Sequence, residues 1–173
     1  MRDEMVDLTP NCQQCAALCC VLLPFDKGAA FAFDKPGSEP CRNLDGHACQ
    51  IHADLAAKGF AGCLRYDCHG AGQRVVQEVF EGRSWRQDAT LLPAMDQAFR
   101  AMRRLHEDYG LLVAAGQLPL TRAEETQRQD LLSALKIAAP QTEASLATYE
   151  TGPNPRAVKA YLSALRQRLR PHR

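Results

Sequence analysis

The chain has 173 residues and a formal net charge of +1. This length is enough for one domain, or for one small module with an extension. A net charge so close to zero creates no overall electrostatic field that would attract nucleic acid or a membrane surface. We therefore expect neither of them as a partner.

The N-terminus reads MRDEMVDLTP and has acidic residues where an export signal would have a basic start and an apolar run. The longest apolar run, near Ala16–Phe25, is interrupted by Pro24 and is too short to cross a membrane. We expect a soluble, cytoplasmic protein. In that reducing compartment, dense cysteines indicate metal binding rather than disulfides.

All eight cysteines lie between Cys12 and Cys68, with the spacing C-x2-C-x3-C-C-x20-C-x7-C-x13-C-x4-C. Thiolates are strong ligands of soft and borderline metals. The N-terminal half has few large apolar side chains, and small modules of this kind are commonly held together by metals. The candidate metal- and cofactor-binding residues are Cys12, Cys15, Cys19, Cys20, Cys41, Cys49, Cys63 and Cys68.

The first cysteines predict a helix over Cys12–Leu22. On such a helix Cys12, Cys15 and Cys19 share one face, and Cys20 points about 100° away from Cys19. Three thiolates from one face, joined by a later cysteine, suit a [4Fe–4S] cluster in which each iron takes one thiolate. Cys20 then either serves a second centre or packs as a small apolar side chain.

The middle of the chain contains weaker signals. Phe31 and Phe33 alternate with alanines and predict a strand, and Ala53–Lys58 predicts a short helix that ends at Gly59. The spacing of the apolar residues in Val75–Phe80 is helical, but their β-branching makes a strand nearly as good an interpretation.

Four histidines were considered as possible additional metal ligands. His52 follows Cys49 at ligand spacing and is a further candidate ligand, so a zinc site remains open beside iron–sulfur. We interpret His69 as a residue beside the centre, His47 as an exposed turn residue and His106 as a core residue. Copper(I) bound by cysteine-lined helices is a third possibility.

Small residues after the last cysteine also fit a centre. Gly70 and Gly72 let the backbone pass close to it, and we interpret Asp67 as a turn residue that accepts backbone N–H groups.

The second half predicts three amphipathic helices. Apolar residues in Leu92–Val113 recur every three or four positions, Thr121 and Glu124 form a capping-box pattern, and Asn154-Pro155 starts a third helix. The predicted fold is mainly α. It consists of an irregular, metal-stapled cysteine-rich module over residues 1–88, packed on a bundle of about three helices over residues 89–173.

Four pieces of the cysteine segment occur in the order CQQCAALCC, CRNL, CQIH and CLRYDC. In this order they resemble the YkgJ-type cysteine-cluster family, described as a zinc- or iron-chelating domain. The run from FDKPGSEPCRNL to CLRYDCHGAGQ is similar to a cysteine module that precedes pentapeptide-repeat domains in some bacterial proteins, although no pentapeptide array is present. Many relatives carry Arg-Pro where this chain has Asp54-Leu55-Ala56-Ala57.

The resemblance implies a metal or iron–sulfur centre, as does a related cysteine cluster in a flagellin lysine methylase. We expect a [4Fe–4S] protein for electron transfer or redox sensing, acting with another protein as its partner. The alternatives are a structural zinc-binding interaction module and a copper or zinc buffering protein. No pair of nucleophile and base is visible, so a non-enzymatic role is favoured.

Overall fold

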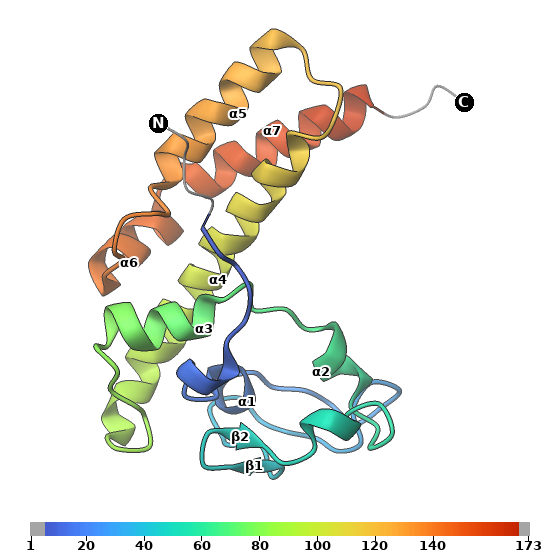
Figure 1. Ribbon diagram of the computed structural model, residues 1–173, viewed down its shortest axis with the longest axis vertical. Helices are drawn as coiled ribbons and strands as arrows, with labels where there is room; N and C mark the ends of the chain where they lie inside the picture. The colour runs from blue at the N-terminus through green and yellow to red at the C-terminus, as the bar shows by residue number, and fades with distance from the viewer. Residues whose placement is uncertain (1–5, 170–173) are drawn as a thin grey trace.

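The computed structural model describes residues 6–169, and these residues confirm a mainly helical fold (Figure 1). The described sheet has two short strands, β1 (Leu44–Asp45) and β2 (Ala48–Cys49), paired antiparallel with Leu44 opposite Cys49. Residues 1–5, on which the export argument partly rests, lie outside the described residues.

The long helix α4 (Leu92–Ala115) connects the two ends of the molecule (Figure 1). It packs against α1 (Leu18–Leu22) and α3 (Ala71–Arg74) from the cysteine-bearing half, and against helices from the second half. The predicted seam is confirmed: Met95, Phe99, Met102 and His106 are fully buried.

Three further helices follow, α5 (Arg122–Leu135), α6 (Glu143–Thr151) and α7 (Asn154–Arg168). The capping box of Thr121 and Glu124 forms at the start of α5, as predicted. The expected count of three helices in this half is too low by one among the described residues, because α6 was missed. It is short and buries only Leu146 and Tyr149, which leaves little periodic signal.

The single helix expected over Cys12–Leu22 is wrong. A 3₁₀ turn, η1 (Cys12–Gln14), is separated from α1 by Cys15, Ala16 and Ala17, and the φ angles of the two alanines are 47° and 57°. Two consecutive left-handed residues reverse the local path of the chain, which a continuous right-handed helix cannot do.

The strand expected at Phe31 and Phe33 does not form either. The two rings join Phe25 and Phe60 in an aromatic cluster, in which Phe25 stacks on Phe31 at 4.3 Å between ring centroids. Side chain packing therefore replaces strand pairing here, apart from one isolated bridge between Phe25 and Lys35.

The remaining elements of the cysteine-bearing half are short. The predicted helix over Ala53–Lys58 is reduced to a 3₁₀ turn, η2 (His52–Asp54), and α2 (Ala61–Arg65) carries Cys63. Of the two interpretations of Val75–Phe80, the helical one is correct: α3 continues into a π-helical turn, η3 (Val75–Val79).

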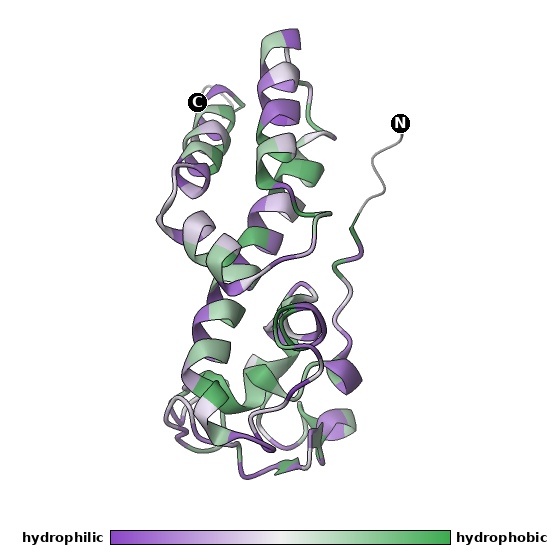
Figure 2. Cartoon of the chain, turned by 90° about the vertical axis from the view of Figure 1, so that its left-hand side faces the viewer, coloured by the Kyte–Doolittle hydropathy of each residue, from purple (hydrophilic) through white to green (hydrophobic). Residues whose placement is uncertain are grey.

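Buried residues from both halves form one hydrophobic cluster that includes Leu18 and Val21 of α1, Phe99 of α4 and Val158 of α7. Figure 2 shows hydrophobic stretches facing inward where α4 meets the cysteine-bearing half. Within residues 6–169, no helix is both long and apolar enough to cross a membrane.

Candidate metal centre

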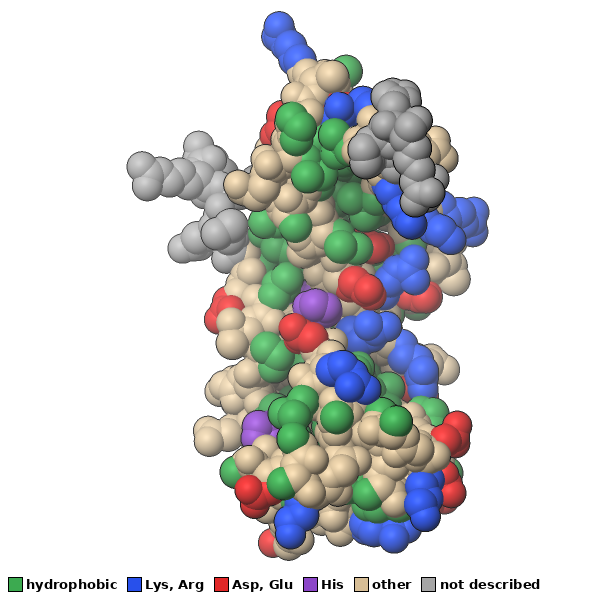
Figure 3. All heavy atoms as spheres, turned by 90° about the vertical axis from the view of Figure 1, so that its right-hand side faces the viewer, with side chains coloured by type: hydrophobic (Ala, Val, Ile, Leu, Met, Phe, Trp, Pro, Cys, Tyr) green, Lys and Arg blue, Asp and Glu red, His purple; other side chains and the backbone are tan. Residues whose placement is uncertain are grey.

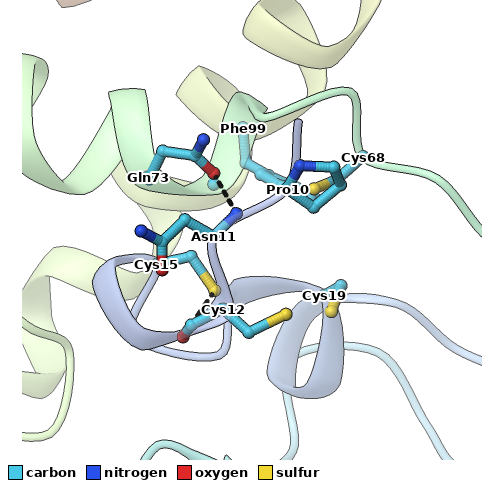
Figure 4. A pocket seen from close by; sticks show the side chains of 9 residues that line it. Pro10, Asn11, Cys12, Cys15, Cys19, Cys68, Gln73 and Phe99 are labelled. Carbon is cyan, nitrogen blue, oxygen red and sulfur yellow. Dashed lines mark hydrogen bonds between the residues drawn. The ribbon is translucent and has the colours of Figure 1, made fainter. Parts of the chain in front are cut away.

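Four cysteines line one small pocket between the start of the chain and α3 (Figure 4). Cys12, Cys15 and Cys19 come from η1, the turn after it and α1, and Cys68 comes from the segment that leads into α3. The sequence analysis had grouped Cys12, Cys15 and Cys19. The structure adds Cys68, the last cysteine of the chain, to these three.

The left-handed turn at Ala16 and Ala17 connects η1, which carries Cys12, to α1, which carries Cys19. Gly72 of α3 also lines the pocket, and a Cβ atom added to Gly72 would lie 2.8 Å from the Cβ of Cys15. A glycine at this position therefore lets the backbone of α3 pass next to Cys15.

The side-chain amide of Gln73 holds the start of the cysteine segment against α3 through two hydrogen bonds. The side chain of Gln73 accepts a hydrogen bond from the Asn11 N–H at 2.9 Å and donates one to the Thr9 carbonyl at 2.8 Å. The Asn11 side chain in turn caps η1 by accepting from the Gln13 N–H. Sequence reasoning missed Gln73, because its role depends on contacts 62 and 64 residues away in the chain.

The residues on either side of Cys68, Asp67 and His69, are held by a series of connected hydrogen bonds. The Asp67 carboxylate accepts from the His69 N–H at 2.7 Å, as predicted for a turn residue. The His69 carbonyl contacts Nδ1 of His106, and Nε2 of His106 lies 3.1 Å from Nη1 of Arg74. Since an arginine only donates, Nε2 accepts and Nδ1 carries the proton that is donated to His69.

His106 is therefore a neutral core residue, in agreement with its sequence interpretation. Burial, followed by the positive charge of Arg74, lowers its pKa to about 4, although the hydrogen bond to the His69 carbonyl opposes this shift. His52 is exposed on η2, and Nε2 of His47 lies 2.9 Å from Oγ of Ser84.

The other four cysteines come from different elements: Cys20 from α1, Cys41 from the loop before β1, Cys49 from β2 and Cys63 from α2. The Cys41 N–H donates to the Cys20 carbonyl at 3.0 Å. Burial raises the pKa of Cys63 to about 11, and electrostatic interaction with the thiols of Cys20, Cys41 and Cys49 adds to the rise.

The neighbouring residues Cys19 and Cys20 connect the two groups of cysteines. Their sulfurs lie 3.9 Å apart and share a hydrogen bond. This bond raises the pKa of Cys19 and lowers that of Cys20, and the nearby Lys35 ammonium further lowers the pKa of Cys20.

Burial favours the protonated thiols of Cys12 and Cys15 unless a cation is present. Burial raises the pKa of Cys15 to about 11 and also raises that of Cys12. A metal cation stabilises thiolates and reverses this preference.

The four cysteine sulfurs at the pocket are donor atoms that suit a soft or borderline metal. In this structure, however, they are not placed around one point as the ligands of a single ion are. The pocket has a volume of about 20 Å³, close to that of one water-sized particle. Within residues 6–169, no three cysteine, histidine or acidic side chains converge tightly enough to hold one metal ion. Binding of one ion would require the thiols to move closer together, and of the four only Cys12 is exposed.

Over 102 residues the chain is 51% identical to "Uncharacterized protein YybG" of Bacillus subtilis (strain 168). The match covers 58% of this chain and 37% of YybG, so the chain spans well under half the length of that relative. No family model matches the chain, and no solved structure matches it. The resemblance to the YkgJ-type family therefore stays a hypothesis.

Proposed function

We propose that the protein is a metal-binding cysteine-cluster protein in which Cys12, Cys15, Cys19 and Cys68 hold an iron–sulfur cluster used in electron transfer or redox sensing. The observation that carries the proposal is the gathering of these four thiols, from both ends of the cysteine segment, at one pocket. Thiolates at four corners are the usual ligands of a [4Fe–4S] cluster.

The four thiols do not converge on one point, and this arrangement favours a cluster over a single ion. Each iron of a cluster takes its own thiolate, so the sulfurs do not have to converge on one point. The exposed Cys12 places one side of the site next to solvent, where electrons can pass to or from a partner. When bound, the cluster supplies one-electron chemistry, and the protein residues orient and shield it.

A structural zinc site is the second candidate, and the small volume of the pocket favours it. About 20 Å³ accommodates one ion more readily than a four-iron cluster. Zinc in this position would join η1 and α1 to the start of α3 and would stabilise the fold without redox chemistry.

In either case we propose another protein chain as the partner. On the face shown in Figure 3, basic and acidic side chains are interspersed. A mixed surface of this kind suits recognition by complementary local contacts rather than by one uniform field.

The test is anaerobic purification followed by a visible spectrum and by iron, acid-labile sulfide and zinc analysis of the same sample. A brown protein with about four irons and four sulfides per chain supports the cluster. A colourless protein with zinc and no iron supports the structural site instead. Protein that holds neither metal as purified, nor after incubation with ferrous iron and sulfide or with Zn²⁺, contradicts both.

A further inference from the structure

A groove of about 340 Å³ lies between α4 and α7, two helices that carry no cysteine. Each helix contributes positions i, i+3, i+4 and i+7, which form one stripe along two helical turns. The lining residues are Arg104, Glu107, Asp108 and Leu111 on α4, and Lys159, Leu162, Ser163 and Arg166 on α7. Since seven residues of a helix rise by about 10 Å, the groove has walls of this length on both sides.

The groove has an apolar part that the core does not cover. Leu111 is 46% exposed and is one of three large hydrophobic side chains that are exposed among residues 6–169. Leu162, on the facing helix, is half-buried and packs against the hydrophobic cluster. A single exposed leucine is ordinary, but one that lines a groove beside a second leucine offers an anchor point for the apolar side chains of a partner.

The acidic side chains of the groove already have partners within the chain. Glu107 forms an ion pair with Arg103 at 3.4 Å. The Asp108 carboxylate accepts a hydrogen bond from the Tyr149 hydroxyl, and it lies 3.5 Å from Arg104. Both negative charges are therefore compensated by the protein itself.

The basic side chains that α7 places in the groove have no such partners. Among residues 6–169, no carboxylate lies within ion-pair distance of Lys159 or Arg166, and α7 itself contains no acidic residue. Arg166 lies in the last turn, where a cation also complements the helix dipole, but Lys159 lies in the middle of the helix, where the dipole gives no such reason. The groove therefore has uncompensated positive charge beside its leucines.

We propose that this groove binds an acidic amphipathic helix of a partner protein, whose apolar side chains contact Leu111 and Leu162 and whose carboxylates pair with Lys159 and Arg166. A helix suits a groove that is two turns long, because it presents apolar residues at i, i+4 and i+7 on one face. Complementary charges then select the partner and speed the encounter. The inference deepens the proposed function, from which it takes only that the partner is another protein chain.

The probe is a fluorescein-labelled synthetic peptide of about 18 residues, long enough to form a helix in isolation. It carries leucines at i, i+4 and i+7 with glutamates on both sides of them. Two matched peptides carry lysine in place of each glutamate, or serine in place of each leucine. Fluorescence anisotropy measures the Kd of each peptide for the full-length protein, purified anaerobically.

Two changes alter the groove, Leu111→Asp and the double variant Lys159→Glu with Arg166→Glu. Leu118→Asp and Arg156→Glu are the matched controls, because both residues are exposed and neither lines the groove. We expect either groove change to raise the Kd of the acidic peptide about tenfold or more, and either control to change it by less than about twofold. Circular dichroism verifies that each variant is folded.

At high salt the acidic peptide should bind more weakly, and at low salt both matched peptides should bind more weakly than it does. Absence of binding by the acidic peptide, equal binding of the lysine peptide, or equal effects of the groove and control changes would overturn the inference.

Two other occupants of the groove have their own readouts. Dimerisation of the wild type that Leu111→Asp abolishes, measured by analytical ultracentrifugation, would assign the groove to a second copy of the chain. Binding to phosphatidylserine vesicles that the double charge reversal abolishes would assign it to a membrane surface. Either result would overturn the inference.

Metal analysis of the same samples separates this inference from the proposed function. Protein that holds metal but does not bind the acidic peptide overturns the inference and leaves the metal centre standing. Protein that binds the peptide in the expected pattern but holds no metal, even after reconstitution, supports the groove and contradicts the metal centre.

Discussion

Gly72 is the residue at which α3 comes closest to the first group of cysteines. Gly72→Ala places a methyl group 2.8 Å from the Cβ of Cys15, so the backbone must shift. We expect a loss of about 1–3 kcal/mol in the free energy of unfolding, the usual cost of overpacking, together with weaker metal retention. Urea unfolding and metal analysis measure the two effects. Gly28→Ala is the control, because its added Cβ meets no atom within 4 Å; equal effects of the two changes would contradict the prediction.

His106 predicts how stability depends on pH. Its pKa is lowered to about 4, first by burial, from an ordinary value of 6.5, with Arg74, Glu78 and His69 as the charged or titratable groups around it. Between these two pH values the unfolded chain binds a proton that the folded chain does not, so stability falls as the pH drops from about 6.5 toward 4. This group can account for a loss of about 3 kcal/mol.

The measurement is urea unfolding at a series of pH values from 7 to 4.5 for the wild type and for His106→Gln, which has no titrating ring. The variant should be less stable at pH 7 but should lose less stability on acidification. Parallel curves for the two proteins would mean that His106 does not cause the pH dependence.

At the level of single residues, the sequence identified His106 as a core histidine and Asp67 as a turn residue that accepts a backbone N–H. Residue type and spacing are enough for such assignments, because they depend on the chemistry of the side chain and on its near neighbours. Gln73 and Lys35 were not recognised. Each acts on carbonyl or N–H groups whose positions depend on how separate segments pack.

At the level of elements, α4 and α6 are joined by a buried hydrogen bond from the Tyr149 hydroxyl to the Asp108 carboxylate. Tyr149→Phe leaves this carboxylate with only Arg104, at 3.5 Å, among the described side chains. We expect a loss of about 2 kcal/mol in the free energy of unfolding, as for hydrogen bonds to charged groups.

Tyr161→Phe is the matched control, because the Tyr161 hydroxyl donates to a neutral carbonyl, that of Glu124, at 3.2 Å. Its cost should be about 1 kcal/mol or less. Chemical denaturation of both variants gives the comparison, and a larger loss for Tyr161→Phe would refute the assigned role of the charged acceptor.

The elements that were predicted correctly share a strong local signal. The long apolar seam of α4 and the capping box of α5 are readable from residues within one or two turns. The helix over Cys12–Leu22 was wrong because Ala16 and Ala17 adopt left-handed φ angles, which alanine does not signal locally. Such a conformation persists only where surrounding contacts hold it, and both residues are buried.

For the whole molecule, the segment between α1 and α3 has little core of its own. From residue 23 to residue 67 the buried residues are Lys35, Leu55 and Phe60. We expect metal to supply much of the free energy that orders this segment, as in other small metal-bound modules. Complete chelation should therefore increase hydrogen exchange in residues 23–67 far more than in α5 and α7.

Hydrogen exchange with mass spectrometry, before and after chelation, locates the change. The helices α5 and α7 serve as the internal reference, since they pack on α4 away from the cysteines. Unchanged exchange, circular dichroism and protease resistance after complete metal removal would show that the segment is ordered without metal.

The sequence by itself determined the helical class, the long seam of α4 and the set of eight candidate ligands, because periodicity and residue chemistry are local properties. Only the tertiary structure decided which of these cysteines lie together at one pocket. Cys68 joins Cys12, Cys15 and Cys19 because the left-handed turn at Ala16 and Ala17 and the bare backbone of Gly72 let α3 pack against that turn. Such packing brings together residues far apart in the chain, and no spacing within one segment encodes it.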